Sequence, residues 1–433
     1  MSGQIICADV LDGLAMLPEK SVHCIMTSPP YFNLRTYFHP GEIGCEKTVQ
    51  EYIDKLVACF GGCWRVLRDD GTLWVVIGDS FATGKGTCFN PGGGATSLGK
   101  DLKAAGVHPL DRGNKSELKA QGLKPKDLLM VPARLALALQ AEGWYLRQMI
   151  TWAKGISFCP AYAGSTMPSS VTDRPISSHE NILLLSKSPR YFYDRLAVTE
   201  PCRRKASGNK ERFVPCDDEG DGRGRPHVHV GASVPWEDDG SGRNLRSVWA
   251  VSIQAGREQG VKHYAKFPEG LVEPCIKAGT SQRGCCPKCL APWKRISRKK
   301  VASPGQRPGY TSECTGRNDG QRGGYWIDGR TETVGWEPGC GCQENGVPLP
   351  PVPCTVLDCF LGSGTTALVA SRLGRDFVGI DIQPEYVKMA TDRLLSAGVA
   401  VNGVQGVKTT EVPKVKTVQV QAEPADPCAV NWE

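Results

Sequence analysis

A chain of 433 residues is long enough for a catalytic domain with a large core and one or two smaller modules. Its 40% hydrophobic and 22% charged residues are typical of a soluble globular protein, and its net charge of +7 permits a polyanionic partner without requiring one. No apolar run is long enough to cross a bilayer, and the first residues lack a signal-peptide pattern, so we expect a cytoplasmic protein that does not associate with membranes.

Residues 1–79 alternate between strand and helix patterns, which predicts an α/β sheet. Strands are expected at residues 4–7, 24–27 and 72–78, with helices at 12–17 and 49–67. Residues 80–126 are Gly-rich and polar, with few apolar residues at periodic positions. Such a segment is typical of a flexible insertion in the sheet.

The sheet pattern resumes after residue 127 and again towards the end of the chain. A helix is predicted at 127–140, strands at 144–152, 181–185, 354–357 and 377–380, and helices at 365–373 and 384–397. The intervening stretches are rich in Gly, Arg, Asp and Pro at 200–245 and in Cys and Gly at 284–345. Residues 400–433 show no core pattern, so we expect a disordered tail.

A glycine-rich turn follows the strand predicted at 354–357 and precedes a helix, as in the cofactor turn of a doubly wound sheet. Its residues are Asp358, Phe360, Gly362, Ser363, Gly364 and Thr365. Glycines let the backbone approach a nucleotide-like ligand closely, and Asp381 at the end of the next strand would lie beside the hydroxyls of a ribose. The alternative for this half alone is a tight turn with a surface Asp.

The motif Ser28-Pro29-Pro30-Tyr31 follows the strand predicted at 24–27, so it should lie at the carboxyl end of that strand, where open α/β sheets bind ligands. A polar oxygen, a rigid turn and an aromatic face suit a flipped-out base whose amine must be held and stacked. The alternative is a Pro-Pro turn beside a core tyrosine.

Together the two motifs resemble those of the beta class of DNA amino-methyltransferases, the phage and bacterial enzymes that methylate the N4 amine of cytosine or the N6 amine of adenine. The catalytic motif precedes the cofactor motif, which is the permuted order of that class. The resemblance implies a circularly permuted, Rossmann-like sheet that binds S-adenosyl-L-methionine, with recognition insertions and a small zinc module. Cys359 replaces the proline usual in the family's cofactor turn, and we expect cofactor binding to survive this change.

The resemblance also assigns cofactor contacts. Asp358 and Gly362 would lie near the methionine moiety and Asp381 at the ribose, while Asp9 would approach the adenine. Phe267 and Pro268 resemble the segment that covers the cofactor in the family. The alternatives from the residues alone are a helix cap at Asp9 and a hydrophobic staple at the start of a helix after Pro268.

Methylation of an exocyclic amine requires no protein nucleophile, because the amine nitrogen attacks the sulfonium methyl group directly. Ser28 and the Pro29 carbonyl group would orient the amine, and Tyr31 would stack on the base. Within the family, Ser before Pro-Pro-Tyr favours cytosine and Asp favours adenine, so we expect N4-cytosine methylation, with N6-adenine as the alternative. The expected partner is double-stranded DNA, while a cognate restriction endonuclease and the oligomeric state are left open.

The resemblance divides the chain into eight segments. They are the catalytic half of the core at 1–79, a flexible insertion at 80–126, core continuation and target-recognition elements at 127–199, a recognition region that returns to the core at 200–260, a cofactor-covering segment at 261–283, a Cys-rich zinc module at 284–345, the cofactor-binding half at 346–399 and a tail at 400–433.

Basic residues in the recognition region are expected to contact phosphates or base edges of DNA. They are Arg203, Arg204, Lys205, Lys210, Arg212, Arg223 and Arg225, and the alternative for each is a solvated loop residue.

Four cysteines in two close pairs, Cys286, Cys289, Cys340 and Cys342, have the arrangement of a structural zinc site. Unliganded thiols are the alternative, and Cys285 is a possible replacement for Cys286. The basic residues at 294–300 would let this module also hold DNA. The other cysteines are scattered as in a reduced intracellular protein, so we expect no disulfides.

Three other functions remain open. Carbon methylation of cytosine needs a nucleophilic cysteine, usually after proline. Cys202, Cys275 and Cys354 each follow a proline, but none lies in the extended active-site context of that family, and the Ser-Pro-Pro-Tyr motif would be unexplained. Methylation of a protein glutamine uses similar Pro-Pro-Tyr loops, although those enzymes usually have Asn before the prolines and the unpermuted order. A DNA-binding protein built on a decayed methyltransferase is the third, against which the intact Ser28, Tyr31 and glycines argue.

Overall fold

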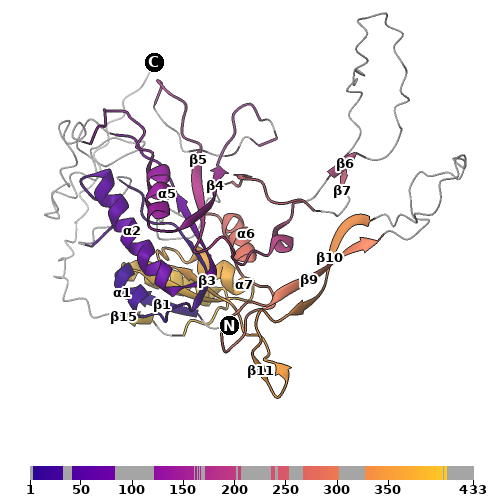
Figure 1. Ribbon diagram of the computed structural model, residues 1–433. Helices are drawn as coiled ribbons and strands as arrows, with labels where there is room; N and C mark the ends of the chain where they lie inside the picture. The colour runs from indigo at the N-terminus through magenta and orange to yellow at the C-terminus, as the bar shows by residue number, and fades with distance from the viewer. Residues whose placement is uncertain are drawn as a thin grey trace, which may run out of the picture.

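The computed structural model describes residues 3–32, 41–82, 121–159, 161–162, 164, 166, 171–200, 203–205, 236–238, 242–252, 267–301, 327–402 and 404–406. Its centre is one nine-stranded sheet (Figure 1). The strands, in their order across the sheet, are β15 (Val404–Gly406), β1 (Gly3–Cys7), β14 (Asp376–Asp381), β13 (Thr355–Asp358), β2 (Val22–Thr27), β3 (Leu67–Ile77), β5 (His179–Ser186), β4 (Tyr145–Ala153) and β8 (Val248–Ala250). Strand β5 runs antiparallel to both of its neighbours, and all other pairs are parallel.

Strands from the two ends of the chain interleave in this sheet. Strand β1 pairs with β14 and β15, and β2 pairs with β13, with Leu357 opposite Ile25. The predicted α/β sheet, permuted so that the first strand lies beside strands of the C-terminal part, is therefore confirmed. Since β13 and β2 have their chain neighbours β14 and β3 on opposite sides, the strand order reverses between them, and such a reversal is where open sheets bind ligands.

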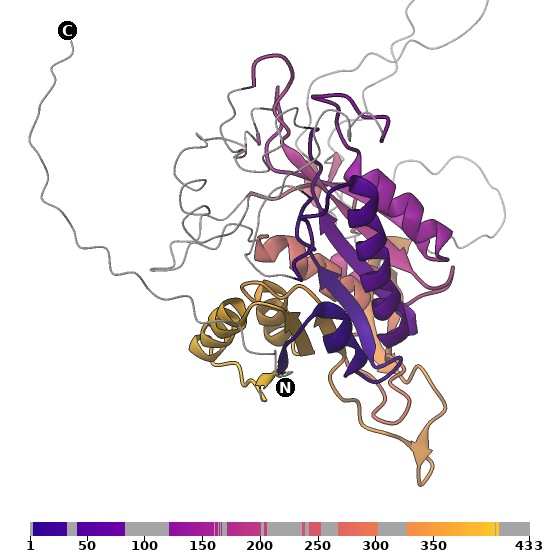
Figure 2. The ribbon, with the colours of Figure 1, turned by 90° about the vertical axis from the view of Figure 1, so that its left-hand side faces the viewer.

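Helices cover both faces of the sheet (Figures 1 and 2). One face packs against α1 (Val10–Ala15), α2 (Val49–Val66) and α5 (Val131–Ala141), and the other against α6 (Glu269–Gly279), α7 (Thr365–Arg372) and α8 (Pro384–Ser396). Neighbouring residues of one strand alternate between the two cores: Val75 faces the α2 side and Trp74 the α6 side. The result is a three-layer α/β/α core.

Local sequence explains where the helices begin. Helix α2 starts with a capping box, in which the Thr48 hydroxyl accepts from the Glu51 amide and the Glu51 side chain accepts from the Thr48 amide. Helix α5 was expected to start at residue 127 but starts at Val131, because Met130 is left-handed (φ 55°) and Pro132 lies in the first turn, where proline is tolerated.

The described residues beyond 400 include a strand that the sequence pattern did not predict. Strand β15 pairs in parallel with β1, with Val404 opposite Ile5. The expectation that the whole segment is disordered is therefore wrong at residues 404–406. Backbone pairing to an exposed sheet edge needs no hydrophobic periodicity, which is why the composition of the segment gave no sign of it.

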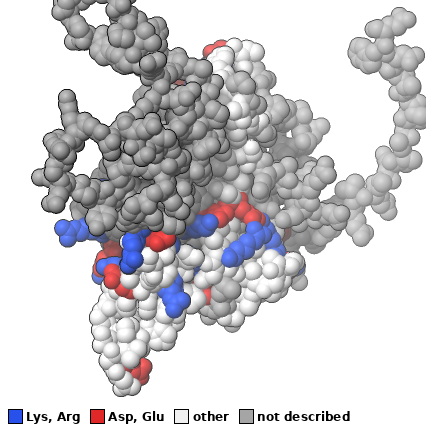
Figure 3. Space-filling model, turned by 90° about the vertical axis from the view of Figure 1, so that its right-hand side faces the viewer, with Lys and Arg blue, Asp and Glu red and all other residues white. Residues whose placement is uncertain are grey.

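Among the described residues, three small two-stranded sheets lie outside the core: β6 (Arg203–Lys205) pairs with β7 (Trp236–Asp238), β9 (Lys294–Val301) with β10 (Ile327–Glu337), and β11 (Gln343–Glu344) with β12 (Val347–Pro348). A short 3-10 helix, η1 (Arg195–Val198), follows β5 in the chain. Figure 3 shows Lys and Arg side chains interspersed with Asp and Glu on the side of the molecule that carries the β9–β10 hairpin. Within the described part of the chain, no helix has the length and apolar character of a membrane span.

Candidate functional site

The two motifs meet at the point where the strand order reverses. Thr27 ends β2 and Asp358 ends β13, and the Thr27 hydroxyl donates to the Asp358 Oδ1 atom at 2.6 Å. Behind them, the Thr366 hydroxyl of α7 donates to the Met26 carbonyl oxygen at 3.2 Å. Residues that are 331 positions apart in the sequence thus form one buried seam, and Ser28 continues directly from it.

The glycine-rich turn is held by backbone bonds to both acids. The Phe360 amide donates to Asp358 Oδ1 at 3.1 Å, and the Gly362 amide donates to Asp381 Oδ2 at 2.8 Å. Gly362 and Gly364 both have positive φ (50° and 75°), and a Cβ atom on Gly364 would lie 3.0 Å from the Ala390 Cβ atom. Only glycine makes this turn without backbone strain, so the two glycines are needed for its shape.

Ser363 and Thr365 lie in the turn but bond to helix α8. The Arg393 guanidinium donates to the Ser363 carbonyl oxygen at 3.1 Å and to the Thr365 hydroxyl at 3.0 Å. Both residues are buried. These contacts hold the turn against α8. In the structure, Ser363 and Thr365 therefore shape the turn.

Asp358 has a buried oxygen that suits a bound cationic or donor group. Its side chain is 1% exposed, and Oδ2 has no hydrogen-bond partner among the described residues, the nearby Thr366 hydroxyl being bonded to Met26 instead. An unpaired buried carboxylate oxygen costs free energy unless a ligand supplies the partner. The residues therefore fit a cofactor that carries an ammonium group and a ribose, with Asp381 at the end of the neighbouring strand.

Burial raises the pKa of Asp358 to about 6, opposed by the Thr27 hydroxyl, and burial likewise raises the pKa of Asp381 to about 6. A carboxyl whose pKa is higher in the fold than in the unfolded chain stabilises the fold below its unfolded pKa, and this contribution is lost as the pH rises through about 6. We expect wild-type stability to fall relative to that of Asp358→Asn by up to roughly 3 kcal/mol between about pH 4 and 7. Urea unfolding of both ligand-free proteins measures this, and a pH-independent difference would contradict it.

Asp9, Phe267 and Pro268 have structural contacts around the cofactor turn. Asp9 follows β1 and its Oδ1 atom accepts from the Leu11 amide at 2.9 Å, so it is the N-cap of α1. Pro268 is the buried N-cap residue of α6, and the half-buried Phe267 packs against the core on the α6–α7 side. The described contacts are those of a helix cap and a packing residue, and contact with a cofactor stays a prediction for all three.

The Ser28-Pro29-Pro30-Tyr31 motif is fixed from two sides. The Tyr52 hydroxyl of α2 donates to the Pro30 carbonyl oxygen at 2.8 Å, and the Tyr31 hydroxyl donates to Glu180 Oε2 at 2.6 Å. Burial, followed by the nearby Glu180 carboxylate, raises the pKa of Tyr31 well above its ordinary value, whereas the adjacent Ser28 hydroxyl lowers it. Tyr31 therefore stays a neutral hydrogen-bond donor, beside Ser28 and at the end of the catalytic strand.

Glu180 and Lys154 are site residues to which the sequence assigned no role. Glu180 lies in β5 opposite Trp152 of β4, and Lys154 directly follows β4 and forms an ion pair with Glu180. The resemblance placed both in a recognition segment. A charged residue at the end of one predicted strand and another at the start of the next was the available signal, but the order of these strands in the sheet cannot be read from the sequence.

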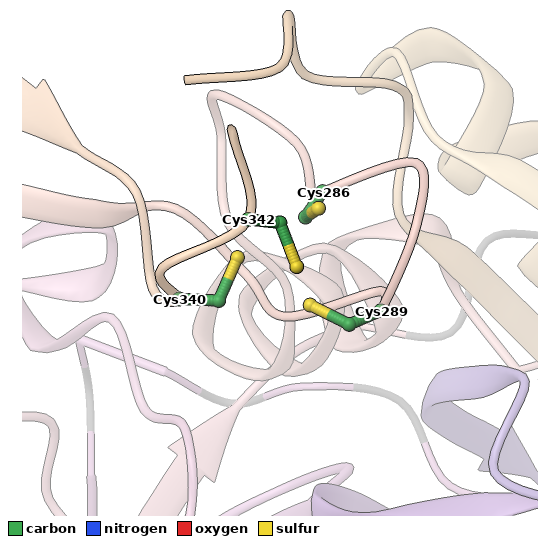
Figure 4. Close-up of side chains that lie close together, drawn as sticks. All are labelled: Cys286, Cys289, Cys340 and Cys342. Carbon is green, nitrogen blue, oxygen red and sulfur yellow. The ribbon is translucent and has the colours of Figure 1, made fainter. Parts of the chain in front are cut away.

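The four cysteines predicted to bind zinc do come together. The sulfur atoms of Cys286, Cys289, Cys340 and Cys342 all lie within 4.8 Å of one another and point inward (Figure 4). Four thiolates at about 2.3 Å from a tetrahedral zinc ion are about 3.8 Å apart, so this cluster needs only a small contraction to hold the metal. Cys285, the possible replacement for Cys286, instead lies with His23 and Cys354 in a separate buried group.

The expectation that the basic run at 294–300 binds DNA is wrong for Arg295. Its guanidinium donates to both carboxylate oxygens of Asp194, at 2.7–3.1 Å, and lies over the Trp336 ring at 4.4 Å. The ion pair joins the hairpin to the segment before η1, with Arg295 13% and Asp194 4% exposed. A charge paired in this way is unavailable to phosphate.

Other predicted recognition residues lie outside the described side chains. This is true of Arg203, Arg204 and Lys205, of which only the backbone is described, and of Lys210, Arg212, Arg223 and Arg225. Most of the expected insertion at 80–126 also lies outside the described residues.

The cysteines that would serve carbon methylation of cytosine are unsuited to it. Cys275 is fully buried in α6, and burial raises the pKa of its thiol well above the ordinary value. Cys354 is fully buried just before β13, at the other end of that strand from Asp358. Cys202 lies outside the described residues. A nucleophile must be accessible as thiolate, so neither described cysteine fits this chemistry.

Comparisons with known proteins cover both motifs. The family model for DNA methylase matches residues 22–286 and 354–392. The Type II methyltransferase M.XycI of Xanthomonas campestris pv. cyanopsidis is 33% identical over 388 residues, which are 89% of this chain and 85% of the relative. M.SmaI of Serratia marcescens is 32% identical over 394 residues, 91% of each chain. Among solved structures, the cytosine-N4-specific PvuII DNA methyltransferase aligns over 92% of this chain and 90% of its own, with a TM-score of 0.46 and 17% identity.

Proposed function

This chain belongs to the DNA methylase family, and we propose that this S-adenosyl-L-methionine-dependent methyltransferase modifies the N4 amine of a cytosine flipped out of double-stranded DNA. The N6 amine of adenine is the alternative target. The observation that carries the proposal is the hydrogen bond from Thr27 to Asp358, because it joins the strand of the catalytic motif to the strand of the cofactor turn. A methyl donor held on β13 and an amine held after β2 would then meet at one sheet edge.

The residues of the turn would hold the cofactor. Asp358, with its unpartnered Oδ2 atom, would accept a hydrogen bond from the methionine ammonium group, and Asp381 would accept from ribose hydroxyls. Gly362 and Gly364 leave the backbone accessible at this point. When bound, S-adenosyl-L-methionine supplies the electrophilic methyl group on a sulfonium.

The catalytic motif would orient the amine. As the nitrogen lone pair forms a bond to the methyl carbon, the carbon–sulfur bond breaks and its electron pair remains on sulfur, and the nitrogen then loses one proton to solvent. Hydrogen bonds from the amine to the Ser28 oxygen and the Pro29 carbonyl oxygen would draw the lone pair out of conjugation with the ring. The Tyr31 ring would stack on the flipped base. Pre-organisation is thus the chief contribution of the protein.

Support for cytosine comes from Ser28. Within the family that the sequence resembles, Ser at this position favours cytosine and Asp favours adenine. A neutral hydroxyl can accept a hydrogen bond from the exocyclic amine without placing a negative charge beside it.

The proposal is tested by incubating the purified protein with unmethylated DNA and isotope-labelled S-adenosyl-L-methionine, digesting the DNA and identifying the labelled nucleoside by mass spectrometry. Label on the cytosine N4 amine is the expected result. Label on the adenine N6 amine would leave the reaction type unchanged and identify adenine as the target base. Absence of label from every DNA tested, with the cofactor bound, would overturn the proposal and favour a protein substrate.

We also propose that Cys286, Cys289, Cys340 and Cys342 hold a structural zinc ion. Cys289→Ser is expected to lose most of the bound metal and to lower the unfolding temperature of the module, because a missing thiolate opens the tetrahedral site. Metal content by elemental analysis of the purified variants measures the first effect. Cys159→Ser is the matched control, because Cys159 belongs to neither group of described residues that could hold a metal, and it should retain the metal. Full metal content in Cys289→Ser would refute the ligand set.

A partner restriction endonuclease is proposed from the relatives, which are named Type II methyltransferases. Such a nuclease would cut the same DNA sequence that this enzyme protects. DNA modified by the enzyme and then challenged with Type II nucleases of mapped specificity would reveal the shared site as a loss of cutting. Cutting of modified and unmodified DNA to the same extent at the methylated site would exclude that nuclease as the partner.

A further inference from the structure

A partly buried ion pair, Lys154 with Glu180, lies next to the catalytic motif without a part in the methyl transfer described above. Strand β3 lies between the catalytic strand β2 and β5, and β4 lies beyond β5. The end of β4 and the start of β5 are on the same sheet edge as the catalytic motif, because β5 is antiparallel to β3. Glu180 therefore reaches Tyr31 from across one strand, β3, and Lys154 lies at the end of the strand beyond it.

The contacts form a chain. Lys154 donates to Glu180 Oε1 and also lies over the Trp152 ring, 4.7 Å from its centroid. The other carboxylate oxygen of Glu180, Oε2, accepts from the Tyr31 hydroxyl at 2.6 Å. Lys154 and Glu180 are only 20% and 15% exposed, so each carboxylate oxygen has a defined partner and little access to water.

Local packing makes room for these contacts between Lys154, Glu180 and Tyr31. A Cβ atom on Gly78, at the end of β3, would lie 2.7 Å from the Tyr31 ring, so glycine is needed for the ring to reach Glu180. Burying an ion pair costs desolvation free energy that the pairing often fails to recover. A pair kept in such a place is therefore better explained by the geometry that it imposes on Tyr31 than by stability.

The charge on Glu180 decides the direction of the hydrogen bonds. A carboxylate accepts only, so the single proton of the Tyr31 hydroxyl is committed to Glu180. The Ser28 hydroxyl lowers the pKa of Tyr31, as a hydrogen-bond donor does, and with the Tyr31 proton on Glu180 any hydrogen bond between the two hydroxyls runs from Ser28 to Tyr31. With its proton used in this way, the Ser28 oxygen presents its lone pairs, which is what acceptance of a hydrogen bond from an amine requires.

We propose that Glu180, held by Lys154, is a positioning residue that polarises the chain from Tyr31 to Ser28 so that Ser28 accepts a hydrogen bond from the target amine. The inference rests on the proposed function and deepens it, because it names what makes Ser28 an acceptor. Glu180 itself does not touch the reacting atoms. Its effect should therefore depend on the Tyr31 hydroxyl.

The test is a double-mutant cycle of Glu180→Gln and Tyr31→Phe, with kcat, KM for DNA and the cofactor Kd measured for each protein. Glu180→Gln keeps the shape of the side chain but removes the charge that forces acceptance. We expect kcat to fall about 20-fold, in line with a lost hydrogen bond to a charged group, while KM and the cofactor Kd change less than about twofold. Tyr31→Phe should lower kcat to a similar extent, and the double variant should be no slower than the slower single variant.

Asp392→Asn, which breaks the exposed ion pair with Lys388 on α8, is the control and should keep wild-type kcat. Unchanged kcat in Glu180→Gln, or a double variant whose loss is the product of the single losses, would overturn the inference, because Glu180 would then act without the Tyr31 hydroxyl. A wild-type enzyme that labels no DNA would remove the proposed function and this inference together. An active wild type with independent variants would remove the inference alone.

Discussion

Asp358→Asn should weaken S-adenosyl-L-methionine binding by about 100-fold, because a hydrogen bond between two charged groups is lost from a buried site. The substitution is nearly isosteric, and the asparagine oxygen can still accept from the Thr27 hydroxyl, so the seam between β2 and β13 should survive. What disappears is the negative charge beside Oδ2, the atom that lacks a partner among the described residues. Titration calorimetry with the cofactor measures the loss.

The stability of Asp358→Asn distinguishes a loss of cofactor binding from misfolding of the variant. Because burial raises the pKa of Asp358 to about 6, the ionised carboxylate destabilises the ligand-free fold above that pH, and Asp358→Asn should be at least as stable as wild type at pH 8. Asp392→Asn on the surface of α8 is the control for a carboxylate-to-amide change and should bind the cofactor normally. Wild-type affinity in Asp358→Asn would remove this carboxylate from the cofactor site, whereas weak binding with a collapsed unfolding transition would indicate a structural effect.

Tyr31→Ala should lower kcat/KM for DNA by about 100-fold and leave the cofactor Kd nearly unchanged. Stacking of a base on an aromatic side chain is worth about 1–3 kcal/mol, and the alanine variant also loses the hydrogen bond to Glu180. The acids of the cofactor turn lie on β13 and β14, so we expect a substitution at Tyr31 to weaken base capture and to leave cofactor binding nearly intact. Steady-state kinetics with varied DNA, together with cofactor titration, measure both.

Tyr31→Phe separates the loss of base stacking from the loss of the hydrogen bond to Glu180. It keeps the ring for stacking and removes only the hydroxyl, so it should retain more activity than Tyr31→Ala. Equal loss of cofactor affinity and of kcat/KM in Tyr31→Ala would mean that the substitution disturbs the whole site, and Tyr31 would then have no separate part in base capture.

Much of the core could be predicted because its signals are local. The strand predicted at 377–380 is β14 at Asp376–Asp381, and the helix predicted at 49–67 is α2 at Val49–Val66. Continuous apolar runs identify buried parallel strands, and the capping box identifies the start of α2. The permuted order of the motifs further predicted that the first strand pairs with strands of the C-terminal part, which β1 and β14 confirm.

The candidate site was predictable only in part. The motifs were recognisable because each is a short run with unusual backbone demands, a Pro-Pro turn and two glycines of positive φ. Glu180 and Arg295 show the limit. Both are charged residues in segments that the sequence pattern assigned to recognition or DNA binding, yet one holds Tyr31 and the other is paired with Asp194. Nothing in their neighbouring residues distinguishes these cases.

The sequence by itself determined which chemical groups the chain carries: a Ser-Pro-Pro-Tyr motif, a glycine-rich turn with two acids, and four cysteines at the spacing of a metal site. Tertiary structure alone decided which of these groups meet. It joined Thr27 to Asp358, grouped Cys286 with the other three cysteines of the predicted zinc site and its neighbour Cys285 with His23, and placed Glu180 on Tyr31. The physical reason is that residue type sets what a side chain can donate, accept or ligate, whereas its partner depends on strand order and packing between segments far apart in the chain.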